Sequence, residues 1–330
     1  MSVQITIIGL GQVGSSIGLA LAGQKNIKRV GHDKNYEAAR QAQKMGAVDD
    51  VKVNLPASVS DAQVVILSLP LSEIRDTLGY IAQDLQAGTV ILDTAPAKGK
   101  VVEWVSEILP PELYYVGLAP AAGTTYLHGT EIGVNSARAD LFKNGLFLVN
   151  APSGTPGGAL ELASNLVSLL GAEVMFTDAV EADGLLASTH LLPQLAGAAL
   201  LDSTVNQPGW REARRLAARP YAAVTAAITY HDEPKSLGDA ALANRGNTVR
   251  VLDELIASLQ NLRERIAEAD GEGVIEYLEA AAKARDRWFN ERSKAEWETA
   301  SRSKQTSDSF GDRLSQMFAG NLFRRDKKKK

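Results

Sequence analysis

The sequence predicts an α/β protein, with a doubly wound parallel sheet in its first half and an all-helical domain in its second. Three observations lead to this prediction. Short runs of Val, Ile and Leu alternate with longer amphipathic stretches as far as residue 178, which is typical of a parallel sheet covered by helices. A glycine-rich turn follows the first apolar run. Beyond residue 178 the strand signals end, and Ala- and Leu-rich helical patterns replace them.

Seven short apolar runs are the candidate strands. Most are continuous rather than alternating, as expected of strands that are buried on both faces of a parallel sheet. They span residues 3–8, 29–31, 64–69, 89–92, 114–116, 146–149 and 173–176. Helical patterns lie between them. In residues 72–85, for example, apolar residues recur every three or four positions.

The second half of the chain contains helical patterns at residues 180–206, 211–230, 237–268 and 272–297. Pro193 interrupts the first of them and predicts a kink, because proline cannot donate the helical hydrogen bond. We therefore expect an α/β domain over residues 1–178, a helical domain over 179–297 and a disordered basic tail over 298–330, which ends in "RRDKKKK".

Composition excludes several classes of function. The chain of 330 residues has no cysteine, which excludes disulfides, thiolate nucleophiles and cysteine zinc sites. Its four histidines lack helical metal-ligand spacing, so we predict no metal site. The net charge of −4 gives no reason to expect a nucleic-acid partner. We see no signal peptide and no apolar run of about 18–20 residues, and we expect a cytoplasmic protein without a membrane span.

The clearest motif is "ITIIGLGQVGSSIG", which places Gly9, Gly11 and Gly14 as G-x-G-x-x-G between a strand and a helix. The glycines permit a tight turn, close approach of the backbone to a pyrophosphate, and close packing of strand and helix. The helix that follows, with Gln12 and Val13 in its first turn, offers free N–H groups and a favourable dipole to phosphates. The motif predicts a Rossmann-type dinucleotide-binding domain.

An acidic residue indicates which dinucleotide binds. Asp33 follows the second strand, in "RVGHD", about 20 residues beyond the glycine turn, where a carboxylate binds the ribose hydroxyls. A carboxylate there repels a 2′-phosphate, so NAD is favoured over NADP, although the neighbouring Lys34 weakens the preference. Ligands of such folds bind beyond the carboxyl ends of the strands. There "SLPLSE" supplies Ser68 and Pro70 as further cofactor-binding residues.

Two more loops are expected at the same edge of the sheet. "DTAPAK" (93–98) contains Thr94 and Lys98, which are candidate catalytic residues. "GLAPAAG" (117–123) lies where such proteins usually carry their chemistry, yet it contains no acid, base, nucleophile or metal ligand.

Taken together, these loops resemble the prephenate/arogenate dehydrogenase family, whose members oxidatively decarboxylate prephenate or arogenate with a nicotinamide cofactor on the way to tyrosine. The similarity runs in order over about residues 3–260, through "DTAPAKGKVVE", "APAAG…GVNSARADLF", "STHLLPQLAGAAL" and "WREARRLAARP…ANR". The resemblance implies an NAD-dependent dehydrogenase, a small carboxylic-acid substrate, and a homodimer formed through the helical domain.

The sequence departs from the family pattern at two positions. Pro96 stands where the family motif Asp-x-x-Ser-x-Lys has its serine, between Asp93 and Lys98. Ala119 stands where the next motif, His-Pro-Met-Ala-Gly, has the catalytic histidine. In the family this histidine accepts a hydrogen bond from the ring hydroxyl, and the serine helps to hold it. Neither alanine nor proline has a side chain that does this, so "GLAPAAG" corresponds to the catalytic loop without its base.

Other family positions are retained. His190, in "THLLPQ", matches the family's "SHLPQ" and is expected to face the cofactor, although its apolar surroundings also fit a buried core histidine. Arg215, in "REARRLA", matches the arginine that binds a substrate carboxylate, although a solvated helix face is the plainer interpretation. Asn244 matches the later Asn-Arg pair and is assigned to the substrate.

The segment "TTYLHGTEI" (124–132) is longer than its family counterpart and carries His128. We hypothesise that His128, oriented by Glu131, reaches back as a substitute base. A polar surface loop is the alternative.

Two alternatives also remain for the whole protein. The scaffold acts on a different carboxylic acid, or it is a nucleotide-binding protein without turnover.

Overall fold

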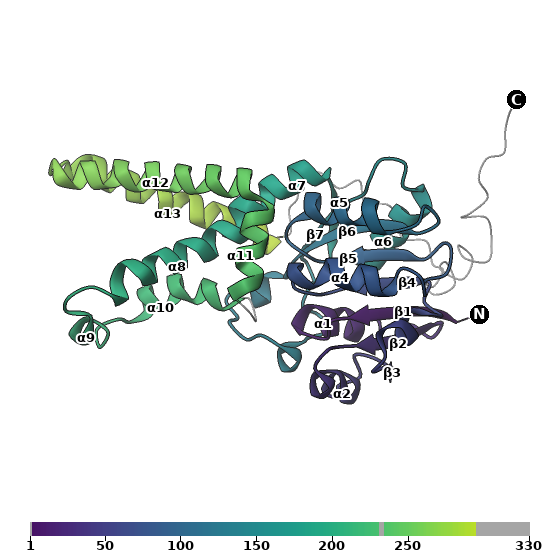
Figure 1. Ribbon diagram of the computed structural model, residues 1–330. Helices are drawn as coiled ribbons and strands as arrows, with labels where there is room; N and C mark the ends of the chain where they lie inside the picture. The colour runs from purple at the N-terminus through teal and green to yellow at the C-terminus, as the bar shows by residue number, and fades with distance from the viewer. Residues whose placement is uncertain (1, 231–233, 295–330) are drawn as a thin grey trace, which may run out of the picture.

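The first half of the chain forms an eight-stranded sheet, whose strand order is β3-β2-β1-β4-β5-β6-β7-β8 (Figure 1). The computed structural model describes residues 2–230 and 234–294. Neighbouring strands are parallel except for β6 and β7, which are antiparallel. The strands are β1 (Val3–Ile8), β2 (Ile27–His32), β3 (Asp50–Val51), β4 (Val64–Leu67), β5 (Val90–Asp93), β6 (Tyr114–Ala121), β7 (Leu146–Asn150) and β8 (Glu173–Phe176). The predicted doubly wound sheet is confirmed.

Helices cover both faces of the sheet, which explains the continuous apolar runs of its strands. They are α1 (Gln12–Ala20), α2 (Tyr36–Lys44), α3 (Leu55–Val59), α4 (Leu71–Ile81), α5 (Lys98–Ile108) and α6 (Gly157–Leu169). One apolar cluster joins the sheet to α1, α2 and α6, and the other joins it to α3, α4 and α5. Side chains of β1 alternate between them, with Ile5 and Ile7 in the first and Ile8 in the second.

Beyond β8 every regular element in the described part of the chain is helical. The elements are α7 (Ala179–Leu186), η3 (Ala187–Leu191), α8 (Leu192–Val205), α9 (Trp210–Ala213), α10 (Arg219–Thr225), η4 (Ala226–Tyr230), α11 (Pro234–Ala243), α12 (Arg245–Ala267) and α13 (Gly271–Lys294). Helices α8 and α12 lead away from the sheet, and α13 runs back toward it (Figure 1). Leu191, Leu237 and Ala240 join the cluster under α4 and α5, which anchors the helical domain to the sheet.

The helix around Pro193 contains a π-helical segment, η3. Its wider turn is closed by the N–H of Leu192, which donates to the carbonyl of Ala187, five residues earlier. Because Pro193 has no N–H, it cannot donate to the carbonyl of Thr189, and the wider turn accommodates that loss. The π-helical segment contains His190.

The expected helix over residues 211–230 is instead divided into α9, α10 and η4. Gly209 has a φ of +88° at the start of α9, and Pro220 in the first turn of α10 begins a new helix there. The strand β3 was not predicted, because two residues are too few to show a pattern. The expected tail at residues 298–330 lies outside the described residues.

Of the described residues, one continuous helix, Ala179–Val205, is long and apolar enough to cross a membrane by length and composition alone. In this fold its segments α7 and α8 pack against α5, α10, η4 and α12. A helix that packs within a folded protein passes the same test, so the expected absence of a membrane span stays a prediction.

Candidate functional site

In the turn between β1 and α1, two of the three glycines cannot be replaced by another residue without strain. Gly9 has a φ of +91°, and a Cβ there would lie 2.1 Å from the carbonyl oxygen of Ser68. A Cβ on Gly14 would lie 2.0 Å from the carbonyl oxygen of Gly9. A Cβ on Gly11 would meet nothing within 4 Å. Gly9 and Gly14 therefore hold strand and helix together, and Gly11 leaves the N-terminus of α1 open to a ligand.

A cleft of about 690 Å³ begins at this turn and runs along the carboxyl ends of β1, β2 and β4. Asp33 lines it, and both of its carboxylate oxygens are held in place. Oδ2 accepts the N–H of Leu10 at 2.7 Å, and Oδ1 accepts the N–H of Asn35 at 2.7 Å. A fixed carboxylate, an open helix N-terminus and a long cleft fit the ribose and pyrophosphate of a dinucleotide.

A second cavity of about 250 Å³ adjoins the cleft, and the two share Gly11, Ser68, Leu69, Pro70, Ile132 and Gly133. It lies between the carboxyl ends of β5 and β6 and the helical domain. Its wall is formed by Thr94, Ala95, Pro96, Ala119 and Pro120 from the sheet and by Leu186, His190, Tyr230 and Ser236 from the helical half. None of the described residues that line it is Lys, Arg, Asp or Glu.

The structure brings many of the predicted site residues to these two spaces. Gly9 and Asp33 line the cleft, Gln12, Val13, Thr94 and His190 line the cavity, and Gly11, Ser68 and Pro70 line both. Gly14 is buried behind the turn, where it acts through packing. Pro96 and Ala119, where the sequence analysis expects departures from the family motifs, both line the cavity.

Lys98 lies outside the cavity and is fully buried. Its Nζ is 3.0 and 3.1 Å from the two carboxylate oxygens of Asp93. The hydroxyl of Tyr115 donates to the same carboxylate. Burial lowers the pKa of the Lys98 amine, although the charge of Asp93 opposes this. The structure therefore places Lys98 in a role that supports the β5–α5 loop rather than in contact with a ligand.

Asp183 links this loop to the helical domain. Its Oδ1 accepts the N–H of Lys98 at 2.6 Å, and its Oδ2 accepts the N–H of Gly99 at 3.0 Å, so it caps the N-terminus of α5 from α7. Burial raises the pKa of its carboxyl, and the two N–H donors oppose this. The side chain of Asn244 donates to the carbonyl of Asp183 at 2.6 Å and accepts from Asn247 at 2.9 Å. Asn244 thus holds the helices together and does not line the cavity.

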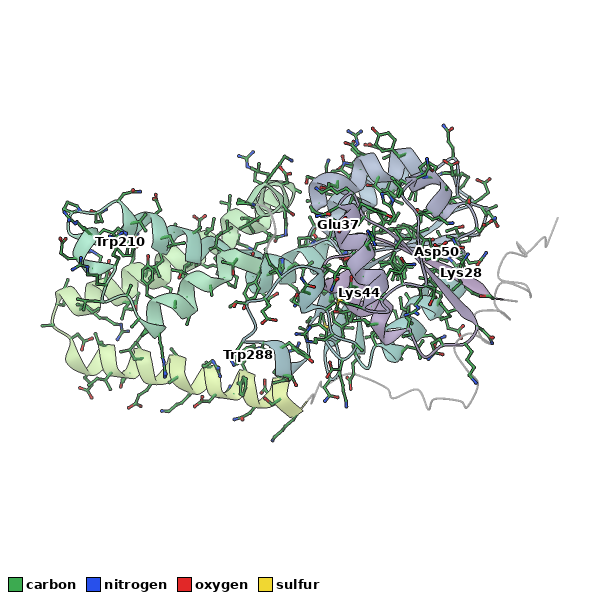
Figure 2. The ribbon with its side chains drawn as sticks, turned by 90° about the horizontal axis from the view of Figure 1, so that it is seen from below. Lys28, Glu37, Lys44, Asp50, Trp210 and Trp288 are labelled. Carbon is green, nitrogen blue, oxygen red and sulfur yellow. The ribbon has the colours of Figure 1, made fainter. Side chains whose placement is uncertain are left out.

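Arg215 is also outside the cavity. It follows α9 on an exposed stretch, and Trp210, which begins that helix, lies at the end of the helical domain remote from the sheet (Figure 2). Within one chain, the predicted carboxylate-binding arginine and the cavity are on different parts of the molecule.

His128 lies against α13 instead of the cavity. Its ring centroid is 6.0 Å from that of Phe289, whereas Glu131 reaches Arg138 with 3.7 Å between Nη2 and Oε2. The geometry for Glu131 to orient His128 is therefore not formed. The start of the same loop is held by the end of α13, because the hydroxyl of Thr124 donates to the carbonyl of Arg292 at 3.1 Å.

Sequence reasoning missed Tyr230, Ser236 and Ile132, which all line the cavity. Pro234 after two acidic residues in "DEPKS" is a helix-start signal, and it would have placed Ser236 in a first turn. Nothing in the local sequence indicates that this turn packs against the sheet domain.

Comparison with known proteins shows the family of this chain. Residues 17–176 match the family model described as prephenate dehydrogenase, nucleotide-binding domain, and residues 178–280 match the one described as prephenate dehydrogenase, dimerization domain. The chain belongs to the prephenate dehydrogenase family. The family resemblance of the sequence is thereby confirmed, and the first domain is a nucleotide-binding domain.

The individual relatives have low sequence identity to this chain, but the matches cover most of it. Prephenate dehydrogenase of Bacillus subtilis is 27% identical over 285 residues, which cover 86% of this chain and 75% of the relative. Cyclohexadienyl dehydrogenase of Zymomonas mobilis is 27% identical over 285 residues, which cover 85% of this chain and 94% of the relative. The crystal structure of prephenate dehydrogenase from A. aeolicus with hydroxyphenyl propionate and NAD+ has a TM-score of 0.76 at 23% identity, covering 87% of this chain and 98% of that one. At 23% identity, the likeness to this crystal structure shows the fold alone.

Proposed function

We propose that this protein is an NAD-dependent dehydrogenase that oxidatively decarboxylates prephenate or arogenate. The observation that carries the proposal is the continuity of two spaces, a cleft shaped for a dinucleotide and a cavity that opens from it toward the helical domain. Membership of the prephenate dehydrogenase family supports the choice of substrate. The cofactor, when bound, would accept a hydride.

The residues of the cavity account for the rest of the reaction. We assign His190 as the base, since it is the one imidazole among the described residues that line the cavity. His190 accepts the proton of the ring hydroxyl while the hydride leaves the ring carbon that bears this hydroxyl. The ring carboxylate then departs as CO2, its bonding electrons make the ring aromatic, and the resulting phenolate regains a proton. Thr94 lies on the opposite wall and positions the ring.

The proposal is tested by the absorbance of NADH with purified protein, NAD and prephenate or arogenate. We expect turnover, and we expect His190→Ala to lower kcat by about 10²–10⁴-fold, as is usual when a general base is removed. NADH affinity of this variant should stay at the wild-type value. His128→Ala separates the two candidate bases. If that variant loses turnover and His190→Ala keeps it, the assignment of the base is wrong.

The cofactor is expected to be NAD because the fixed carboxylate of Asp33 faces the ribose end of the cleft. Replacing Asp33 with Asn keeps the size of the side chain and removes its charge. We expect NADH to bind about tenfold more weakly, because a charge-assisted hydrogen bond is lost, and NADPH to bind more strongly. Fluorescence titration of both nucleotides measures this. An unchanged ratio of the two affinities would remove Asp33 from cofactor selection.

A homodimer through the helical domain is part of the proposal. Helix α12 and the part of α13 up to residue 280 belong to the matched dimerization domain. They carry exposed apolar side chains, namely Ile256, Leu259, Ile266, Ile275 and Leu278. Apolar residues at such density on a helical hairpin favour burial against a second copy.

One observation favours a second candidate function. Where the family motifs carry a serine and a histidine, Pro96 and Ala119 bring no polar side chain to the cavity wall. The same scaffold would then oxidise a different carboxylic acid. Measurable NADH binding without turnover of prephenate or arogenate would count against the first candidate, and turnover of another carboxylic acid would then support the second.

A further inference from the structure

An ion pair joins the two loops that flank the glycine turn in the dinucleotide cleft. Lys34 directly follows Asp33 after β2, and Glu73 is in the first turn of α4, after β4. Because β1 lies between β2 and β4 in the sheet, Lys34 and Glu73 come from opposite sides of the glycine turn. The Lys34 Nζ donates to the carboxylate of Glu73, and both residues line the cleft.

Lys34 is the one Lys or Arg among the described residues that line this cleft, whereas Asp33, Glu73 and Asp76 are its acids. NADP differs from NAD by a phosphate on the 2′-oxygen of the adenine ribose, and such a phosphate carries about 1.5–2 negative charges at pH 7. In Rossmann-type folds a basic side chain near the ribose-binding carboxylate accommodates this phosphate, and a lysine binds phosphate as a point charge. The affinity of the cleft for NADP therefore depends on where the Lys34 amine is held.

The carboxylate of Glu73 holds the amine on the α4 side of the cleft. Asp33 accepts the N–H groups of Leu10 and Asn35, which fixes its carboxylate for the ribose hydroxyls. The side chain of Glu73 is 28% exposed and that of Lys34 is 64% exposed. An amine with this exposure is accessible to a bound phosphate, so a carboxylate that binds it competes directly with the phosphate.

We infer that Glu73 is a second determinant of the preference for NAD, because it binds the Lys34 amine and competes with a 2′-phosphate for it. The inference rests on the proposed function, in which Asp33 selects NAD by facing the ribose. Asp33 acts on the nucleotide itself, whereas Glu73 is a positioning residue that acts through Lys34. The cofactor preference is thus set by two segments, 39 residues apart in the chain, that meet at the cleft.

Fluorescence titration of NADH and of NADPH with the Glu73→Gln variant tests the inference. Glutamine keeps the size of the side chain and removes its charge, which weakens its hold on the amine. We expect NADPH to bind about tenfold more tightly, the value of one hydrogen bond to a charged group, and NADH to bind with the wild-type affinity. Exposed ion pairs contribute little to stability, so the variant should fold, and its NADH affinity verifies this.

The double variant Lys34→Met, Glu73→Gln shows whether Glu73 acts through Lys34. We expect the gain in NADPH affinity to disappear in it, because the amine that binds the phosphate is gone. A gain that remains in the double variant would mean that Glu73 repels the phosphate by its own charge, and the inference would be wrong.

Glu107→Gln is the matched control, because Glu107 on α5 forms an exposed ion pair with Arg75 on α4 at 3.2 Å and does not line the cleft. It should leave both affinities unchanged. An unchanged ratio of NADPH to NADH affinity in Glu73→Gln would overturn the inference and leave the proposed function standing. Binding of neither nucleotide by the wild-type protein would overturn both.

Discussion

Replacing Lys98 with Met is expected to lower the free energy of unfolding by about 3–5 kcal/mol, the usual cost of removing one partner of a buried ion pair. Lys98 and Asp93 are both 0% exposed, and the amine is the cation that contacts this carboxylate. Methionine fills much of the same space but leaves the charge of Asp93 uncompensated. Urea denaturation, followed by circular dichroism, measures the change.

The double variant Asp93→Asn, Lys98→Met is the control for this prediction. It removes both charges, so the large penalty for one unpaired buried charge disappears. We expect it to be more stable than Lys98→Met alone, which a double-mutant cycle quantifies. A loss of less than about 1 kcal/mol in Lys98→Met would show that Asp93 does not depend on Lys98, as in an exposed ion pair.

The sheet and the nucleotide cleft could be predicted from sequence because both depend on local patterns. Continuous apolar runs identify strands with two covered faces, and Gly9, Gly11 and Gly14 are neighbours whose spacing alone specifies the turn. The direction of β7 could not be predicted, since a buried strand shows the same apolar run whether it pairs in parallel or antiparallel.

The cavity was predictable only in part. Its sheet side follows from the rule that ligands bind beyond the carboxyl ends of strands, and Thr94 lies there. Its far side depends on how α11 and η3 dock, and Ser236 reaches it from more than 140 residues beyond Thr94. The motif match predicted that Arg215 binds the substrate carboxylate. A motif indicates residue types, but it does not indicate which end of a helical domain packs against the sheet.

The loop that carries His128 shows the same limit. The sequence allowed either a histidine near the cavity or a polar surface loop. In the structure His128 lies against Phe289 in the last turns of α13, and Thr124 donates to the carbonyl of Arg292 there. These turns lie beyond residue 280, where the match to the dimerization domain ends. A contact between two segments so far apart in the chain leaves no periodicity or spacing in either of them.

Replacing Asp183 with Ala is expected to lower kcat by about 10²-fold, the effect of a displacement of about 1 Å between reacting groups. Asp183 stands seven residues before His190 on one continuous helix, and its carboxylate holds the start of α5 immediately after the loop that contains Thr94. It therefore sets the distance between the two walls of the cavity. NADH affinity should not change, because Asp183 is not among the residues that line the cleft.

Asp178→Ala separates positioning from helix stability. Asp178 caps the same helix, accepting the N–H groups of Val180 and Glu181 at 2.8 Å each, but makes no contact with α5 among the hydrogen bonds described. Loss of either aspartate removes a cap, which costs about 0.5–2 kcal/mol. We expect only Asp183→Ala to lose turnover. Equal losses in both variants would mean that α7 unfolds, and that the link from α7 to α5 has no separate part in placing His190 opposite Thr94.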